Sequence, residues 1–255
     1  MRVVITGGAR GIGAALATRF RADGWDVITA DLSGADVVCD VSVESDLVSL
    51  IDGVGEVDIF VSNAGIGIFG GIEVSNDDWE RIWKINTMSH VWAARRLLPS
   101  WLARGRRYFV QVVSAAGLLT QIGSAPYAVT KHAALAFAEW MHVTHYDAGI
   151  RVSAVCPLGV KTGLLDEAVE QGAGFLLDGV IERNVVSAEQ IAELNDTVKP
   201  SDTESITATF GSAEAMNELA RYPLAPDLMA LLYPHSGVTA SEPAAEMRNI
   251  RGRNI

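Results

Sequence analysis

Short, continuous runs of apolar residues alternate along the chain with longer segments in which apolar residues recur at helical spacing. Because the runs are not interrupted by alternating polar residues, each is expected to be a strand buried on both faces. Strands are predicted at 2–6, 25–31, 36–41, 57–62, 108–113 and 150–155, and helices at 14–22, 43–52, 76–103 and 126–146. This alternation predicts an α/β fold, a doubly wound parallel sheet of six to seven strands with helices on both faces. The pattern does not place the seventh strand, although 206–210 is a candidate.

The turn after the first predicted strand is rich in glycine. Gly7, Gly11 and Gly13 follow one another in the spacing Gly-x-x-x-Gly-x-Gly, and a helix begins at once. Glycine lets the backbone approach a pyrophosphate closely, and the helix N-terminus offers free N–H groups and a partial positive charge. The second strand ends on Asp31. Strand, glycine turn, helix, strand and acid in this order predict a dinucleotide site in a Rossmann-like fold.

The acid at the end of the second strand bears on the choice of dinucleotide. The Asp31 carboxylate can accept hydrogen bonds from both adenosine ribose hydroxyls, whereas a 2′-phosphate there would meet a like charge. Residues 32–35 supply no basic side chain to offset that repulsion, and Arg10 in the glycine turn is the nearby alternative for holding a phosphate. We give Asp31 the greater weight and predict NAD rather than NADP.

A tyrosine and a lysine four residues apart suggest a proton-transfer site. Pro126 is suited to the first turn of a helix, which would place Tyr127 and Lys131 on one face. A phenol ionises near pH 10, and a nearby ammonium would lower that pKa toward the working range. Ser114, at the end of the fifth strand, can bind the same substrate oxygen. Since such a pair also occurs on solvated helix faces, its meaning depends on the rest of the chain.

Two further polar positions lie beside these motifs. Asn63-Ala64-Gly65 follows the fourth strand, where a small turn lets the backbone pass close to a ligand and the amide of Asn63 can tie neighbouring strands. Asn86 lies inside a predicted helix, where asparagine is a mediocre helix former. It is expected to hold a water or a backbone carbonyl near the site, the alternative being an ordinary surface position.

Together these residues resemble the short-chain dehydrogenase/reductase family, in its short single-domain form. The resemblance runs from residue 1 to about 165 and rests on Thr6 to Gly13, Asp31, Asp40, Val41, Asn63 to Gly65, Asn86, Ser114, Tyr127, Lys131, and Pro157 to Thr162. It implies one NAD(P)-binding Rossmann domain over residues 1–255. It also implies an oxidoreductase that interconverts a secondary alcohol and its ketone by hydride transfer.

The resemblance implies a role for each site residue. Tyr127 would be the general acid in carbonyl reduction and the general base in alcohol oxidation. Lys131 would hold the nicotinamide ribose and lower the pKa of Tyr127, Ser114 would polarise the substrate oxygen, and Asn86 would support a water that links Lys131 to solvent. The implied cofactor-binding residues are Gly7, Arg10, Gly11, Ile12, Gly13, Asp31, Asp40, Val41, Asn63, Ala64, Gly65, Tyr127, Lys131, Pro157, Val160 and Thr162. Of these, Val160 and Thr162 would bind the nicotinamide carboxamide and the phosphates.

The chain departs from the family pattern in two places. The family usually has Pro-Gly after the sixth strand, whereas here Leu158 separates Pro157 from Gly159. The last third is also unfamiliar: residues 163–190 are expected to form a substrate lid, and 241–255 a mobile tail.

The predicted substrate opening is mostly apolar. It is expected to comprise residues 66–69, which lie in a flexible glycine-rich lip at 65–71, residues 118–121 and residues 163–182, with no cluster of Arg or Lys for a phosphate. A lipophilic secondary alcohol or ketone is therefore predicted. Three alternatives come from other classes: a non-catalytic NAD-binding redox sensor, a sugar-nucleotide epimerase or dehydratase, and a scaffold. Epimerases are generally longer, and the complete Ser, Tyr and Lys set argues against the sensor.

Charge and cysteine content argue against some classes of binding partner and indicate a cell compartment. The 255 residues carry a net charge of −11, which argues against nucleic acid or an anionic membrane as a partner, and no apolar run is long enough to span a bilayer. Cys39 and Cys156 have no metal or disulfide spacing, so reduced thiols and a cytoplasmic location are expected. His132, His142 and His145 show no metal spacing, so no metal is predicted. The apolar helices at 86–103 and 126–146 suggest a homodimer or homotetramer.

Overall fold

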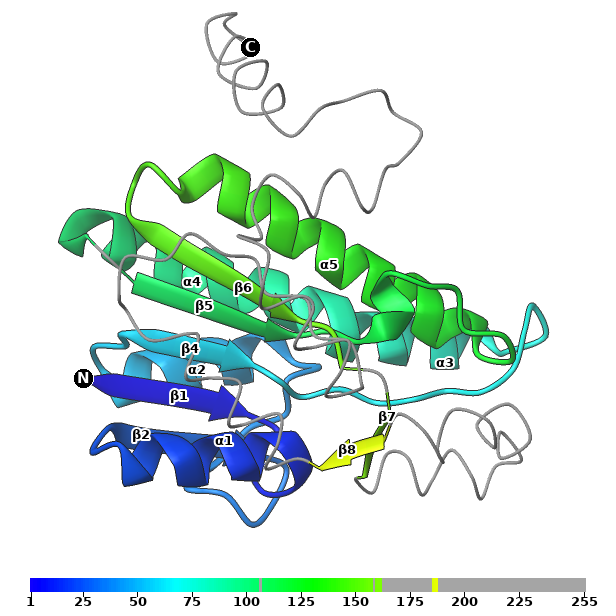
Figure 1. Cartoon of the computed structure of the whole chain (residues 1–255), viewed down its shortest axis with the longest axis horizontal. Coiled ribbons are helices and arrows are strands. Elements are labelled where there is room, and N and C mark those ends of the chain that lie inside the picture. The colour runs from blue at the N-terminus through cyan, green and yellow to red at the C-terminus, as the bar shows by residue number, and fades with distance from the viewer. Residues whose placement is uncertain (106, 158, 162–184, 188–255) are drawn as a thin grey trace, which may run out of the picture.

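One parallel six-stranded sheet forms the centre of the molecule, as the computed structural model in Figure 1 shows. The structure describes residues 1–105, 107–157, 159–161 and 185–187. The strand order is β3-β2-β1-β4-β5-β6. The strands are β1 (Arg2–Thr6), β2 (Asp26–Asp31), β3 (Val37–Val38), β4 (Ile59–Ser62), β5 (Arg107–Val112) and β6 (Ile150–Val155). The predicted α/β fold is confirmed.

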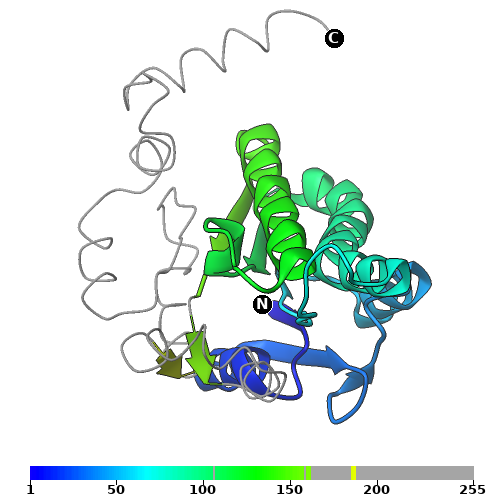
Figure 2. The same ribbon diagram turned by 90° about the vertical axis from the view of Figure 1, so that its right-hand side faces the viewer.

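Helices cover both faces of this sheet (Figures 1 and 2). They are α1 (Gly11–Ala22), α2 (Glu44–Val54), α3 (Asn76–Trp83), the π-helical turn η1 (Lys84–Met88), α4 (Ser89–Arg104), the 3-10 turn η2 (Ala115–Gly117) and α5 (Ala125–His145). Helix α1 packs on one face, and α2, α4 and α5 pack on the other. The sheet is thus shielded from water on both sides, which explains why its strands are continuous apolar runs.

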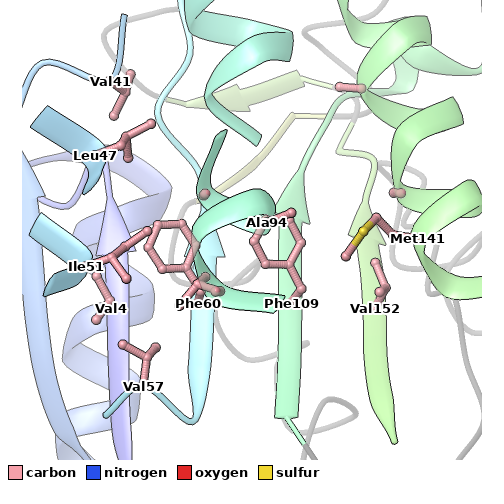
Figure 3. Close-up of a cluster of buried hydrophobic side chains, with 14 of the residues drawn as sticks. Val4, Val41, Leu47, Ile51, Val57, Phe60, Ala94, Phe109, Met141 and Val152 are labelled. Carbon is pink, nitrogen blue, oxygen red and sulfur yellow. The ribbon is translucent and has the colours of Figure 1, made fainter. Parts of the chain in front are cut away.

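Alternate residues of each strand supply two separate cores. Val4, Phe60 and Phe109 face α2, α4 and α5, as Figure 3 shows, whereas Val3 and Ile5 face α1. The Phe60 and Phe109 rings stack with centroids 5.8 Å apart. Each fully buried side chain of this size contributes about 1.5–3 kcal/mol, so the two cores fix the sheet on which the site is built.

The third strand is shorter than predicted, because a side chain replaces backbone pairing at its start. The Asp36 carboxylate accepts hydrogen bonds from the backbone N–H of Thr29 at 2.9 Å and from its hydroxyl at 2.7 Å. Regular pairing with β2 therefore begins only at Val37, opposite Ala30. Asp40, predicted inside this strand, lies in the turn that leads to α2.

Two regions differ from the predicted secondary structure, and three predicted segments lie wholly or mostly outside the described residues. The helix predicted at 76–103 is interrupted by η1, and an unpredicted pair of parallel strands forms from β7 (Gly159–Lys161) and β8 (Val185–Ser187). Except for β8, the predicted lid at 163–190 lies outside the described residues, as do the tail at 241–255 and the candidate strand at 206–210.

Candidate active site

The predicted site residues gather where parallel strands end. The glycine turn follows β1, Asn63 follows β4, and Ser114 lies two residues after β5. Strands β1 and β4 are neighbours, and from them the strand order runs outward in opposite directions. Crossovers therefore leave this point toward opposite edges of the sheet. In doubly wound sheets this is where ligands bind.

The backbone around the glycine turn packs so tightly that Gly13 has no room for a Cβ atom. A Cβ on Gly13 would lie 2.2 Å from the Gly7 carbonyl oxygen and 2.6 Å from the side-chain nitrogen of Asn63. Gly7 and Gly11 have φ of +64° and +56°. Helix α1 starts directly behind the turn, with no acidic residue in its first turn and no side-chain cap from Arg10. Its N-terminal N–H groups are therefore oriented as a pyrophosphate requires.

Asn63 ties the glycine turn to the end of β4, as the sequence predicted. Its amide nitrogen donates to the carbonyl oxygens of Thr6 at 2.9 Å and Gly7 at 3.0 Å. The Thr6 hydroxyl in turn accepts from the backbone N–H groups of Asn63 at 3.0 Å and Ala64 at 3.2 Å. These bonds hold the two strand ends in a fixed relation.

Asp31 lies beside the glycine turn. One carboxylate oxygen accepts from the backbone N–H of Ala9 at 3.1 Å, and the other accepts from that of Leu32 at 2.8 Å. The carboxylate thus stands at the end of β2, where the resemblance implies ribose recognition. Asp40 and Val41 follow the neighbouring edge strand β3, and Val41 packs into the core.

Ser114, Tyr127 and Lys131 are brought together. Ser114 is buried, and its hydroxyl accepts from the backbone N–H of Ala116 at 3.1 Å and lies close enough to Tyr127 to lower the pKa of the phenol. Lys131 is 3% exposed, and its ammonium donates to the Val112 carbonyl oxygen at 3.2 Å. The ammonium nitrogen lies 5.6 Å from the centre of the Tyr127 ring. The arrangement can deliver a proton to an oxygen and stabilise the negative charge left behind.

Burial, rather than the lysine, dominates the pKa of Tyr127. Desolvation raises that pKa above its ordinary value, and the Ser114 hydrogen bond lowers it by less. Burial also lowers the pKa of Lys131 to about 8. The predicted lowering of the Tyr127 pKa toward the working range is therefore not seen here, because desolvation of the phenolate outweighs the favourable contributions. Tyr127 is protonated at neutral pH and can act as an acid.

Asn86 is fully buried in the π-helical turn, and its side chain bonds the segment that follows β4. Its side chain accepts from the backbone N–H of Ile66 and donates to the Ile66 carbonyl, both at 2.9 Å. It also donates to the Thr130 hydroxyl at 3.3 Å. A Cβ on Gly65 would lie 3.3 Å from both the Asn86 side-chain oxygen and the Lys131 ammonium. Asn86 thus holds a backbone group near the site, which was one of the two roles predicted.

Residues 66–70, which we call the strap, lie within the lip predicted at 65–71 and are hydrogen-bonded to the chain directly before α5. Gly70 donates to the Gly123 carbonyl at 2.9 Å and accepts from the Ala125 N–H at 2.9 Å. The Ser124 hydroxyl donates to the Ile68 carbonyl at 2.7 Å. These bonds attach the strap to the segment that leads into α5. Ser124 in that segment lies three residues before Tyr127.

Pro157 and Val160 continue the site from the end of β6. The Pro157 carbonyl accepts from the Ala115 N–H at 2.8 Å. Val160 is buried against Ile12 and Ala15 of α1, so the chain after β6 returns to the glycine turn. Thr162 and Leu158 lie outside the described residues. The glycine turn after β1 and the Asp31 carboxylate at the end of β2 together fit a dinucleotide.

Two buried polar residues near the site, His90 and Gln111, were missed by the sequence reasoning, whereas the free, buried thiol of Cys156 was predicted. His90 and Gln111 are fully buried and hydrogen-bonded to each other at 2.8 Å, and burial lowers the pKa of His90 to about 3. Cys156 accepts a hydrogen bond from the backbone of Ser114, and burial raises the pKa of its thiol to about 12. A glutamine inside the apolar run at 108–113 was the available signal.

Metal clusters and membrane spans were also sought in the described part of the chain. There, no three His, Cys, Asp or Glu residues come together as metal ligands would. Within the same residues, every helix is too short or too polar to cross a membrane.

Comparisons with known proteins agree on one family. A family model described as short chain dehydrogenase matches residues 1–173. The 1-deoxy-11-beta-hydroxypentalenate dehydrogenase of Streptomyces exfoliatus is 32% identical over 217 residues, 75% of this chain and 76% of that protein. The meso-2,3-butanediol dehydrogenase of Serratia marcescens is 31% identical over 182 residues, 64% of this chain and 72% of that protein. The ligand-free aldohexose dehydrogenase of Thermoplasma acidophilum matches in fold, with a TM-score of 0.74 at 23% identity over 84% of this chain and 94% of that one.

Proposed function

The chain belongs to the short-chain dehydrogenase family and is an oxidoreductase of the alcohol dehydrogenase type, and we propose that it interconverts a lipophilic secondary alcohol and its ketone with NAD. The observation that carries the proposal is the meeting of Ser114, Tyr127 and Lys131 beside the glycine turn. A proton donor and a dinucleotide cradle at one sheet edge are the two parts that carbonyl reduction requires.

The chain's residues divide into those that hold the cofactor and those that move a proton. Gly7 to Gly13 and the N-terminus of α1 would hold the pyrophosphate, Asp31 the adenosine ribose, and Lys131 the nicotinamide ribose. When bound, NADH supplies the hydride and NAD accepts it. The Asp31 carboxylate supports the preference for NAD, because a 2′-phosphate would place like charges together.

Tyr127 would transfer the proton. In reduction its hydroxyl gives a proton to the carbonyl oxygen while Ser114 donates a hydrogen bond to the same oxygen, and in oxidation Tyr127 takes the proton back. Lys131, whose pKa burial lowers to about 8, stabilises the phenolate that reduction leaves behind. Asn86, which like Lys131 lies close to Gly65, would support a water through which the proton is replaced from solvent.

The side chains expected around the substrate opening support the proposed substrate class. Ile66, Ile68 and Phe69 of the strap, together with Leu118 and Leu119 after η2, are apolar and partly or largely exposed. An apolar rim of this kind supports a lipophilic alcohol or ketone.

Tyr127→Phe tests the assignment. It removes only the hydroxyl, so the rate of NADH formation with secondary alcohols should fall by at least about 100-fold to 10,000-fold, while the Kd for NAD stays within about twofold. Tyr146→Phe is the matched control, because Tyr146 directly follows the far end of α5 and stacks on Arg151. Substantial activity in the Tyr127 variant would show that another group transfers the proton. Tight NAD binding by a wild type that oxidises no alcohol would favour the redox sensor.

The same proposal extends to assembly and location. Val129, Trp140 and Val143 on α5 and Leu102 on α4 are between 41% and 55% exposed, which supports a helical homodimer interface. Light scattering that gives a monomer mass at micromolar concentration would exclude it. Cys39 and Cys156 are free and buried, in keeping with a reducing compartment such as the cytoplasm.

A further inference from the structure

Ser124 stands where a helix cap is expected but does not cap the helix. It is the residue directly before α5, and serine is favoured there because its oxygen accepts from the first-turn N–H groups. In this chain the side chain makes no such bond, and its hydroxyl donates instead to the Ile68 carbonyl at 2.7 Å. Ser124 is 1% exposed. The Ser124 hydroxyl therefore binds the strap and does not cap α5.

The strap is fixed at both ends, on either side of Tyr127. At one end, Gly70 exchanges backbone hydrogen bonds with Gly123 and Ala125, and its φ of +124° is a conformation that glycine alone adopts readily. At the other end, Ile66 is bound twice by Asn86. Figure 1 shows the segment after β4, in cyan, running to the end of the molecule where α5 begins.

The first attachment point precedes Tyr127 and the second reaches α5 beyond it. Ser124 lies three residues before Tyr127, and Asn86 donates to Thr130, three residues after it. The strap is therefore bonded to the chain directly before α5 and is linked, through Asn86, to Thr130 on α5. Its apolar side chains, Ile66, Ile68 and Phe69, are partly buried, and its backbone is bonded at both ends. In the proposed function these side chains would form a wall of the substrate opening.

Resting on the proposed function, we propose that Ser124 is a positioning residue that fixes the strap beside Tyr127 and so limits the size of the alcohol that the site accepts. A wall held by buried hydrogen bonds does not yield to a bulky substituent, whereas a released wall can move outward. Ser124 touches neither cofactor nor reacting atoms in this scheme. Its effect is on substrate discrimination rather than on proton transfer.

The test compares a small and a bulky secondary alcohol, 2-butanol and 4-phenyl-2-butanol, in wild type and Ser124→Ala. The ratio of kcat/KM for the bulky to the small alcohol should rise about threefold to tenfold, the range that one net hydrogen bond supplies. The kcat for 2-butanol and the Kd for NAD should change less than about twofold, because the groups that transfer the proton are untouched. Hydrogen exchange at the N–H groups of Gly70 and Ala125 should quicken.

Two other variants sharpen the result. Ser100→Ala removes a hydroxyl bonded to a carbonyl oxygen on α4, that of Leu97 at 2.9 Å, and should leave the ratio unchanged. Gly70→Ala disturbs the same attachment from within the strap, because the added Cβ would lie 2.6 Å from a Val74 methyl, and should raise the ratio as Ser124→Ala does. If Ser124→Ala does not fold, Gly70→Ala is the variant in which the ratio is measured.

The outcomes separate this inference from the function on which it rests. An active wild type whose ratio is unaltered in both strap variants would overturn the role of Ser124 alone. A ratio that rises equally in Ser100→Ala would also overturn it, since the change would then be a general loosening. A wild type that oxidises neither alcohol, nor any other, would overturn the proposed function and the size limit together.

Discussion

Acid should weaken the fold through one buried imidazole. His90, in the first turn of α4, is fully buried against Gln111, and burial, reinforced by the charge of Lys131, lowers its pKa to about 3. In the unfolded chain the pKa returns to about 6.5. Between these values the unfolded chain holds the extra proton. The contribution of the neutral imidazole to stability is therefore complete above about pH 6.5 and is lost as the pH falls toward 3.

The size of the effect follows from the pKa difference. Each pH unit below the unfolded pKa costs about 1.4 kcal/mol, so lowering the pH from 7 to 5 should remove about 2 kcal/mol through His90. Other groups also titrate in this range. A variant without the imidazole isolates the contribution, because the remaining groups titrate alike in both proteins.

The double variant His90→Leu with Gln111→Leu is the suitable comparison. It replaces both hydrogen-bonding partners by apolar groups, whereas His90→Leu alone would leave the Gln111 side chain unpaired in the core at both pH values. Urea unfolding at pH 7 and pH 5 gives the free energy of unfolding for each protein. Wild type should lose about 2 kcal/mol more than the double variant between the two pH values. Equal losses would mean that His90 is not held neutral in the fold.

Two further predictions concern the cofactor cradle. Gly13→Ala should weaken NAD binding by at least about tenfold and destabilise the fold by about 1–3 kcal/mol, since its Cβ would lie 2.2 Å from the Gly7 oxygen; calorimetry and urea unfolding measure both. Gly53→Ala, which would meet nothing within 4 Å on α2, is the control and should leave NAD binding intact. Asp31→Ala should raise the ratio of kcat/KM for NADP to that for NAD, because a repulsive carboxylate is removed. A wild type that already prefers NADP would refute the role given to Asp31.

Local patterns in the sequence were enough to predict the strands and most helices. The run Ile150–Val155 is a strand with the expected bounds, and Pro126 lies in the first turn of α5. Periodicity could not reveal that Asp36 replaces backbone pairing at the start of β3, since the bond depends on where Thr29 lies in space. The π-helical turn was equally hidden, because a stretch with one extra residue per turn still reads as helix.

The sequence predicted that Tyr127 and Lys131 lie close together, but not the electrostatics around them or the hydrogen bonds of the strap. Helical spacing correctly placed Tyr127 and Lys131 close together. Spacing says nothing about burial, and burial reverses the expected direction of the Tyr127 pKa. Likewise, glycines at 65–71 suggested flexibility, whereas the bond from Ser124 to Ile68 joins residues 56 positions apart. Contacts of that range are set by the tertiary fold and leave no local signal.

The order of strands in the sheet has a consequence for synthesis of the chain. In the order β3-β2-β1-β4-β5-β6, each strand after the first can join an outer edge of the strands made before it. Strands β2 and β3 extend one side of β1, and β4, β5 and β6 extend the other. Within the described sheet, no strand has to be inserted between two that are already paired. As the nascent polypeptide leaves the ribosome, the sheet can therefore grow outward without breaking any ladder it has formed.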